Sequence, residues 1–340
     1  MESVIFNKVE GAGKSGQEAR LVEIDIMKFY GILLVVLGHV AMIYSPMSLI
    51  KPQVSSELMV RVKEIIYSFH MPLFIFVSGC VFAYQLEIKK RQIGFASLFK
   101  TKFRRLMIPY YVFGFCWVFP VMVILGFRDP LHYAIDGIIL ALDPRHLWFV
   151  MSLFGIFLLF YSFRSLCLKI NFPFWIILVI GFCLYILPVD YPVFFQIKNI
   201  MTYFIWFALG YFFILHKKVS IYIIIIALLI IAVNLIFRDV IPSVLTKFSY
   251  AVMGISIAYL VSIMTCKISK TKLYRLISHN SFGIYLFHAM IIYIVAYIFR
   301  AYTIHPFLLS IIMFFGSLIL SILFTVLCRK VGWGRIIGEK

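Results

Sequence analysis

The chain has 340 residues, of which 63% are hydrophobic and only 14% are charged. Soluble domains hold roughly 45–50% apolar residues, so this composition excludes an ordinary soluble protein. The formal net charge is +18. In a membrane protein such an excess of Lys and Arg reflects basic loops that stay in the cytoplasm. We therefore interpret the charge as a sign of topology and not as a nucleic-acid surface.

Apolar runs long enough to cross about 30 Å of hydrocarbon recur along the chain. They predict an all-α polytopic integral membrane helical bundle with about ten transmembrane helices. With the N-terminus in the cytoplasm, most of the 32 Lys and Arg residues fall on that side, which places both termini there. The expected spans are 24–46, 64–86, 106–126, 146–163, 172–189, 198–216, 220–237, 244–265, 280–300 and 306–328.

The expected domain organisation follows from these spans. Residues 1–22 form a cytoplasmic N-terminal segment, which lacks the apolar core of a removable signal peptide. Residues 23–330 form one transmembrane domain, and residues 331–340 form a cytoplasmic tail. The six cysteines lack paired metal-ligand spacing, so we predict neither a disulfide framework nor a metal site.

The first span, RLVEIDIMKFYGILLVVLGHVAMIY over 20–44, places Asp25, Lys28 and His39 in an otherwise apolar helix. The eleven-residue step from Lys28 to His39 is about three helical turns, so the two share one face. Ionisable residues within a membrane indicate function by default. The alternative is a local Asp25–Lys28 ion pair, with Lys28 reaching back to the interface. Asp25 is about 21 Å along the axis from His39, so any partner of His39 comes from another helix.

Two histidines are expected at similar depth near the external face. His39 lies about 16 Å beyond Lys28 along an outward helix, and His70 follows the start of an inward one. A buried, neutral imidazole can accept a proton from a hydroxyl or attack a carbonyl. We therefore predict that His39 and His70 share one cavity. The alternative is that each histidine only makes a hydrogen bond across a helix interface.

A cytoplasmic run of cations, KKRQIGFASLFKTKFRRLMIPYY over 89–111, lies between the second and third spans. Its members Lys102, Arg104 and Arg105 predict a site for a polyanionic cofactor, because such side chains bind phosphate oxygens. The alternative is a basic loop that lies on anionic headgroups. The sequence has no glycine-rich nucleotide loop that would compete with this assignment.

Polar and aromatic residues also gather near the external face, in LDPRHLWFV over 142–150. Arg145, His146 and Trp148 form the kind of rim that binds sugars. The alternative is that Trp148 anchors the interface and Arg145 pairs with Asp143. His288, in SFGIYLFHAM, lies near mid-membrane with no assigned partner, and a structural and a functional role stay equally open.

Five segments, in the same order along the chain, together resemble the bacterial acyltransferase family 3 of polytopic membrane enzymes. They are IDIMKFYGILLVVLGH, FHMPLFIFVSGCVF, KTKFRRLMIPYY, HLWFV and SFGIYLFH. The first is similar to the family's opening motif, a basic residue followed by ten residues and a histidine, here Lys28 and His39. Together with FHMP, this motif looks closest to the fucose 4-O-acetylase-like branch.

The resemblance implies an enzyme of the bacterial inner membrane that moves an acyl group, usually acetyl from cytoplasmic acetyl-CoA, onto a sugar hydroxyl at the outer side. Its partners would be a glycan acceptor and membrane lipids, with no nucleic acid and no metal. The resemblance makes His39 the catalytic histidine and Lys28 its motif partner. The family's basic motif has two arginines three apart, whereas this chain has Lys102 and Arg105, so the residue that contacts CoA stays open.

Two mechanisms remain open for His39, which either deprotonates the acceptor hydroxyl or carries the acyl group itself. Ser78, Tyr67 and His70 are candidate donors to the oxyanion. The rival classes are a transporter and a non-catalytic partner in polysaccharide export. A transporter is expected to show paired, Gly/Pro-interrupted helices in two related halves, and the sequence shows no such pairing.

Overall fold

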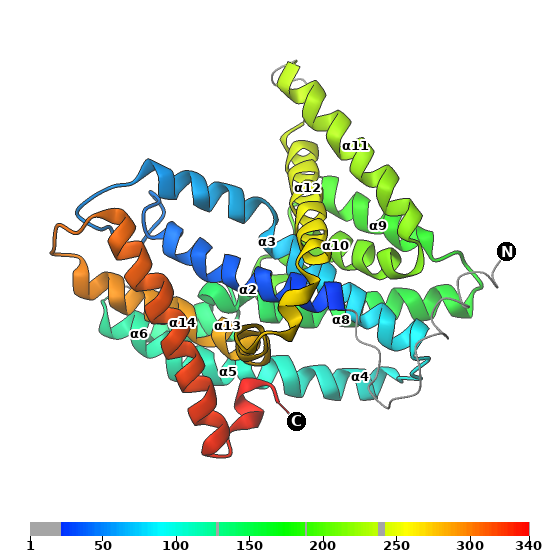
Figure 1. Ribbon diagram of the computed structural model, residues 1–340. Helices are drawn as coiled ribbons and strands as arrows, with labels where there is room; N and C mark the ends of the chain where they lie inside the picture. Colours follow the sequence, from blue (N-terminus) through cyan, green and yellow to red (C-terminus); the bar gives the residue numbers. More distant parts are fainter. Residues whose placement is uncertain (1–21, 127–128, 188, 237–241, 340) are drawn as a thin grey trace.

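The structure, a computed structural model, describes residues 22–126, 129–187, 189–236 and 242–339. All regular elements in this part of the chain are helical, which confirms the predicted all-α membrane bundle. The long helices are α2 (Val22–Met42), α3 (Glu57–Ala83), α8 (Trp148–Lys169), α10 (Ile197–Leu215), α11 (Lys217–Ile236), α12 (Ser243–Met264), α13 (Lys272–Phe299) and α14 (Pro306–Lys330). Figure 1 shows them with α11 extending beyond its neighbours at one side of the bundle.

Eight of the predicted spans coincide with helical segments that are long and apolar enough to cross a membrane, by length and composition. The predicted spans 172–189 and 220–237 coincide with shorter apolar stretches, namely helix α9 (Trp175–Ile186) and residues Ile224–Val233 of α11. At 1.5 Å per residue, the 12 residues of α9 extend about 18 Å, less than the hydrocarbon thickness. The total of ten spans and the side of each terminus stay predictions.

Two helices begin earlier than their apolar runs predicted, because polar caps define their starts. Helix α3 begins at Glu57, where the Ser56 side chain accepts a hydrogen bond from the backbone N–H of Met59. Helix α13 begins at Lys272, where the Thr271 side chain accepts from the N–H of Tyr274. Such caps satisfy backbone donors that the first turn leaves unpaired. The helices therefore extend past the apolar core of each span.

The third span is one helical segment over residues 95–124, which begins earlier than the predicted 106–126. It comprises α4 (Phe95–Lys102), η2 (Phe103–Met107), α5 (Ile108–Phe113), η3 (Gly114–Val118) and α6 (Phe119–Ile124), in which η2 and η3 are π-helical. Each π-helical turn lies just before a proline, Pro109 or Pro120, whose missing N–H interrupts the α-helical hydrogen bonds. The basic motif of the sequence thus lies at a π-helical turn.

A second helical segment, α7 (Pro130–His132) followed by η4 (Tyr133–Ile139), was not predicted. It lies between the predicted spans 106–126 and 146–163. The Asp129 side chain caps its start by accepting from the N–H of His132. The carbonyl of Ile138 accepts a hydrogen bond from the Tyr110 hydroxyl at 2.8 Å, which ties this segment to α5.

The centre of the bundle is formed by α2, α3, α10 and α13. Helix α3 packs against α2 and α10, and α2 also packs against α13. Helices α3 and α10 cross closely, because glycines face the partner backbone at the crossing. A Cβ atom at Gly79 would lie 2.1 Å from the Phe207 carbonyl oxygen, and one at Gly210 would lie 1.9 Å from that of Phe76. Small residues at such crossings let membrane helices approach closely.

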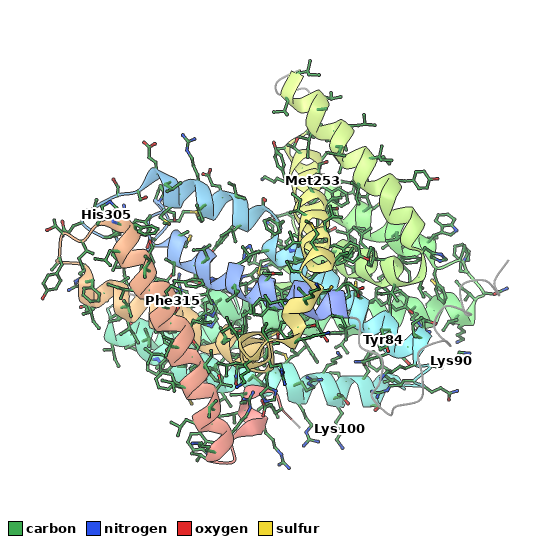
Figure 2. All side chains as sticks on the ribbon, in the orientation of Figure 1. Tyr84, Lys90, Lys100, Met253, His305 and Phe315 are labelled. Atoms are coloured by element: carbon green, nitrogen blue, oxygen red, sulfur yellow. The ribbon has the colours of Figure 1, made fainter. Side chains whose placement is uncertain are left out.

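The basic segment that follows α3 and the loop that precedes α14 lie at opposite ends of the bundle (Figure 2). Figure 2 shows Lys90 and Lys100 at one end and His305, which precedes α14, at the other. The predicted N-terminal segment 1–22 lies outside the described residues except for Val22, where α2 begins. The predicted tail is folded onto the bundle, since its turn η8 (Gly334–Ile337) contacts α5, α13, α14 and η2.

Candidate functional site

A cavity of about 590 Å³ lies between α2, α3, α8 and α13, with η2, α14 and η8 at one end. Its volume is within the range of small-molecule sites, roughly 300–1,000 Å³. Helix α2 contributes Lys28, Ile32 and Val35 to the lining, which are successive residues on one helical face. His39 is the next residue on that face. The cavity therefore runs along the face of α2 that carries Lys28 and leads towards His39.

One end of the cavity is lined by cations. Lys28 and Lys102 line it together with Arg105 and Arg329, and Glu339 is the acidic side chain in the lining. The four cations come from α2, α4, η2 and α14, so segments far apart in the sequence supply them. We call these four residues the cation mouth. Such a concentration of one charge attracts and binds anions.

Lys102 reaches from the cation mouth into the cavity. Its Nζ atom lies 3.3 Å from the centroid of the Phe157 ring and 5.7 Å from that of Phe82. An ammonium over an aromatic face gains a cation–π interaction while its N–H donors stay available to a ligand. Arg105 is more exposed than Lys102, and both line the cavity.

Of the predicted phosphate-binding residues Lys102, Arg104 and Arg105, only two line the cavity. Arg104, which was grouped with Lys102 and Arg105, is exposed and lies outside the cavity lining. Lys28, which the resemblance paired with His39, lies instead at the cation mouth. At 1.5 Å per residue, it is separated from His39 by about 16 Å along α2.

Between the cation mouth and His39 the lining is apolar and aromatic. Phe74, Phe149 and Phe157 are among its residues, and Val35 forms part of its wall next to His39. A hydroxyl group is also present, since Ser78 lines the cavity and donates to the Phe74 carbonyl at 2.9 Å. This middle section suits an uncharged, extended ligand segment, because burial of a charge there would carry a large desolvation cost.

Three imidazoles from three elements meet beyond the apolar section. His39 on α2, His146 on η5 (Arg145–Leu147) and His288 on α13 form this group, which we call the imidazole cluster. The ring centroids of His39 and His288 are 4.7 Å apart, those of His146 and His288 are 5.5 Å apart, and those of His39 and His146 are 6.5 Å apart. The sequence expectation that a partner of His39 comes from another helix agrees with this geometry.

The hydrogen bonds assign a tautomer to two members of the cluster. His288 Nδ1 lies 3.0 Å from the Ile284 carbonyl and 2.8 Å from that of Tyr285, and since carbonyls only accept, Nδ1 carries the hydrogen. The Nε2 atom of neutral His288 is then an acceptor. His39 Nδ1 lies 2.9 Å from the Val35 carbonyl and 3.3 Å from His288 Nε2, so it donates to both. Neutral His39 therefore has its basic lone pair on Nε2.

His146 has one hydrogen-bonded and one unpaired ring nitrogen. Its Nε2 donates to the Leu286 carbonyl at 3.1 Å, whereas its buried Nδ1 has no hydrogen-bond partner in the described part of the chain. Its backbone carbonyl accepts a hydrogen bond from the Tyr285 hydroxyl, and Tyr285 also lines the cavity. The cavity wall and the imidazole cluster are thus directly connected.

The predicted sugar-binding rim does not form one surface. His146 is turned inward and buried, whereas Arg145 pairs with Asp143 at 2.8 Å, as the alternative interpretation predicted. The half-buried Trp148 packs on Tyr203 of α10, with ring centroids 5.3 Å apart. These three side chains do not share one surface because the short turn η5 and the start of α8 direct successive side chains to different neighbours.

His70 lies near the imidazole cluster, and the Tyr67 ring lies between His70 and His39 in the chain of ring contacts. It is buried on α3 and its Nδ1 donates to the Ile66 carbonyl at 2.8 Å. The Tyr67 ring centroid is 4.7 Å from that of His70 and 6.2 Å from that of His39. Neither His39 nor His70 is in the lining of the described cavity, so their predicted shared cavity stays a prediction. Tyr67 is the side chain that contacts both imidazoles.

Sequence reasoning missed the pairing of His39 with His288 and the place of Arg329. Both histidines were expected within the membrane, but they are 249 residues apart, and a sequence gives no direct signal for such contacts. Arg329 follows the last predicted span, 306–328, and had no assigned role. In the described part of the chain, no group of three His, Cys, Asp or Glu side chains is arranged to hold a metal ion.

Comparison with known proteins identifies one relationship. A family model of the acyltransferase 3 type, described as an acyltransferase domain, matches residues 21–326. This match covers α2 to α14 nearly completely, including all three histidines of the imidazole cluster. No curated protein and no solved structure matches the chain.

Proposed function

Because the chain belongs to the acyltransferase 3 family and forms a membrane bundle, we propose that it transfers an acetyl group from cytoplasmic acetyl-CoA to a hydroxyl of a cell-surface or lipid-linked glycan. One observation supports this proposal above the others. A single cavity extends from the cation mouth to Val35 and Tyr285, which contact the imidazole cluster. A long donor with a charged end and a reactive end fits such a cavity.

The donor would bind with its phosphates at the cation mouth. Lys102 and Arg105 offer charge-assisted hydrogen bonds to phosphate oxygens, which are among the stronger hydrogen bonds in proteins. The apolar section would hold the uncharged arm that links the nucleotide to the thioester. The thioester would then lie toward the imidazole cluster.

In the proposed reaction His39 Nε2 removes the proton of the acceptor hydroxyl. The hydroxyl oxygen attacks the thioester carbonyl, the new C–O bond forms, the C–S bond breaks, and the proton passes from His39 to the departing thiolate. His288 Nε2 accepts the hydrogen bond from His39 Nδ1 and so favours the protonated imidazole in the transition state. In a second route His39 Nε2 attacks the thioester first and carries the acyl group. Both routes require the same tautomer.

The acceptor side of the proposal rests on the residues around His39. Tyr67 contacts His39, and the Asp143–Arg145 pair adjoins His146 in the chain, so a sugar at the imidazole cluster would meet these side chains. Ser78 and His70 remain candidates to stabilise the oxyanion. We place the protein in the inner membrane of a bacterium, with the cation mouth at the cytoplasmic face, which agrees with the positive-inside rule.

The proposal is tested with membranes that contain the wild type or the variant His39→Gln, supplied with radiolabelled acetyl-CoA. We expect label in glycan with the wild type and none with the variant. The matched control is His132→Gln, because His132 is largely exposed and lies outside the cavity and the imidazole cluster. Equal labelling of glycan by wild type and His39→Gln would contradict the catalytic role of His39, and label that stays on the protein would identify the acyl-histidine route.

A further inference from the structure

Arg329, near the end of α14, is held rigidly in the cavity lining by two acceptors from α13. Its Nη1 donates to the Asn280 side-chain oxygen at 2.5 Å, and its Nη2 donates to the His279 carbonyl at 3.0 Å. The side chain is only 21% exposed. A guanidinium whose orientation is fixed in this way loses little conformational freedom when it binds an anion.

The remaining edge of this guanidinium already holds an anion. Nε and Nη2 of Arg329 both lie 2.7 Å from one carboxylate oxygen of Glu339. This is the edge that binds a carboxylate or phosphate in a forked arrangement. The Glu339 side chain is 37% exposed, so its carboxylate can leave for water more readily than the guanidinium can move.

The segment that carries Glu339 is positioned at the cavity by a glycine. Gly338 has a φ of +77°, and a Cβ atom there would lie 2.8 Å from the Arg105 carbonyl oxygen. Only glycine fits both the left-handed conformation and this close approach. Gly338 and Glu339 consequently line the cavity beside the π-helical turn that carries Arg105.

A hydroxyl in the same lining has no partner. Ser278 Oγ is buried without a hydrogen bond in the described part of the chain, and Ser278 lines the cavity one residue before His279. Buried polar atoms without partners are uncommon and carry an energetic cost. A ligand with oxygen acceptors in this part of the cavity would satisfy it.

We propose that Arg329, with Ser278 in the adjoining lining, binds the 3′-phosphate of the CoA donor, and that Glu339 occupies this position until the phosphate displaces it. The inference rests on the proposed function. It assigns to Arg329 the phosphate farthest from the thioester, because Arg329 lies on the last turn of α14 whereas Lys102 reaches inward to Phe157. A phosphomonoester carries nearly two negative charges at neutral pH and so outcompetes a single carboxylate.

The test compares the binding of CoA and of dephospho-CoA, which lacks only the 3′-phosphate, to the purified full chain in lipid nanodiscs. The variants are Glu339→Gln and Arg329→Gln. The matched control is Arg335→Gln, since Arg335 is an exposed cation of the same segment and lies outside the cavity lining.

We expect Glu339→Gln to lower the Kd for CoA about two- to five-fold, the range of a weak, partly exposed ion pair. Arg329→Gln raises this Kd about ten-fold or more, because it removes a charge-assisted, forked contact. Arg335→Gln changes the Kd less than about two-fold. For dephospho-CoA, Kd values of the wild type and all three variants agree within about two-fold.

Two results would overturn the assignment. One is an unchanged Kd for CoA in Glu339→Gln, a partly exposed variant that stays informative even where Arg329→Gln fails to fold. The other is an equal effect of Arg329→Gln on CoA and dephospho-CoA. A wild-type protein that binds neither ligand would contradict the proposed donor itself, so that failure is distinguishable from a failure of the Arg329 assignment.

Discussion

The two ends of the cavity differ in almost every physical respect. The cation mouth is formed by long, partly exposed side chains that offer charge to a ligand. The imidazole cluster is formed by rings held by backbone carbonyls, with His146 and His288 buried. At the first end Lys28, Lys102 and Arg105 can adapt to a ligand, whereas Arg329 and the second end are preorganised. In the proposed function this difference would separate donor binding from chemistry, and the predictions below act on these two ends.

The largest effect is expected at the imidazole cluster. Replacing His39 by Gln removes the basic Nε2 atom and leaves a side chain of similar size. We expect kcat to fall about 10²- to 10⁴-fold, the usual contribution of a general base, with little change in the KM for acetyl-CoA. Steady-state kinetics of the purified variant measures both. A kcat within a few-fold of the wild type would show that the chemistry lies elsewhere.

At the opposite end, the double variant Lys102→Ala with Arg105→Ala is expected to act on binding. Loss of two charge-assisted hydrogen bonds raises the KM for acetyl-CoA at least about ten-fold. The kcat at saturating donor should change little, because neither residue is near the imidazoles. Arg104→Ala is the control, since it removes a neighbouring cation that lies outside the lining. The assignment fails when the control and the double variant give the same KM.

His288 offers an intermediate effect on the imidazole cluster. His288→Phe keeps a ring but removes the acceptor of the His39 Nδ1 hydrogen bond, so we expect kcat to fall about ten-fold. His288→Asn provides an amide oxygen that can accept this hydrogen bond and is expected to retain more activity. The KM for acetyl-CoA should be similar in both variants. Lower activity in His288→Asn than in His288→Phe would rule out this positioning role.

The smallest effect is that of salt on the wild type. Raising the ionic strength from about 0.05 M to 0.5 M shortens the screening length and weakens exposed charge interactions. The KM for acetyl-CoA should rise a few-fold, whereas kcat at saturating donor stays nearly constant. A titration with sodium chloride measures both quantities. A kcat that falls in parallel with binding would show that the two ends of the cavity are not separate.

The sequence predicted the cation mouth and the imidazole cluster to different extents. Clustered cations are visible in a sequence, and Lys102 and Arg105 of the predicted set both line the cavity. The sequence could not show that Arg104 lies outside the cavity lining. Which of these side chains faces the cavity depends on the π-helical turn and on helix packing, which the sequence does not reveal. The same limit applies to Arg329, which reaches the cavity through the fold of α14.

For the imidazole cluster, the sequence predicted the depth of His39 in the membrane but not which residues contact it. Residue counting along α2 placed His39 towards the external face, and the expected partner from another helix is His288. The identity of that partner depends on how α13 packs against α2, and His146 was expected at a surface because η5 carries polar residues in its sequence. Helix starts were likewise misplaced where Ser56 and Thr271 cap helices before the apolar run.

The most direct test of the central claim is the side from which the donor enters. Radiolabelled acetyl-CoA, which does not cross membranes, is supplied to sealed inverted vesicles and to sealed right-side-out vesicles that contain the wild type and its glycan acceptor. We predict that glycan is labelled only in inverted vesicles, where the cation mouth faces the donor, and that the label is protected inside. Labelling in right-side-out vesicles alone would contradict a cavity that receives its donor from the cytoplasm.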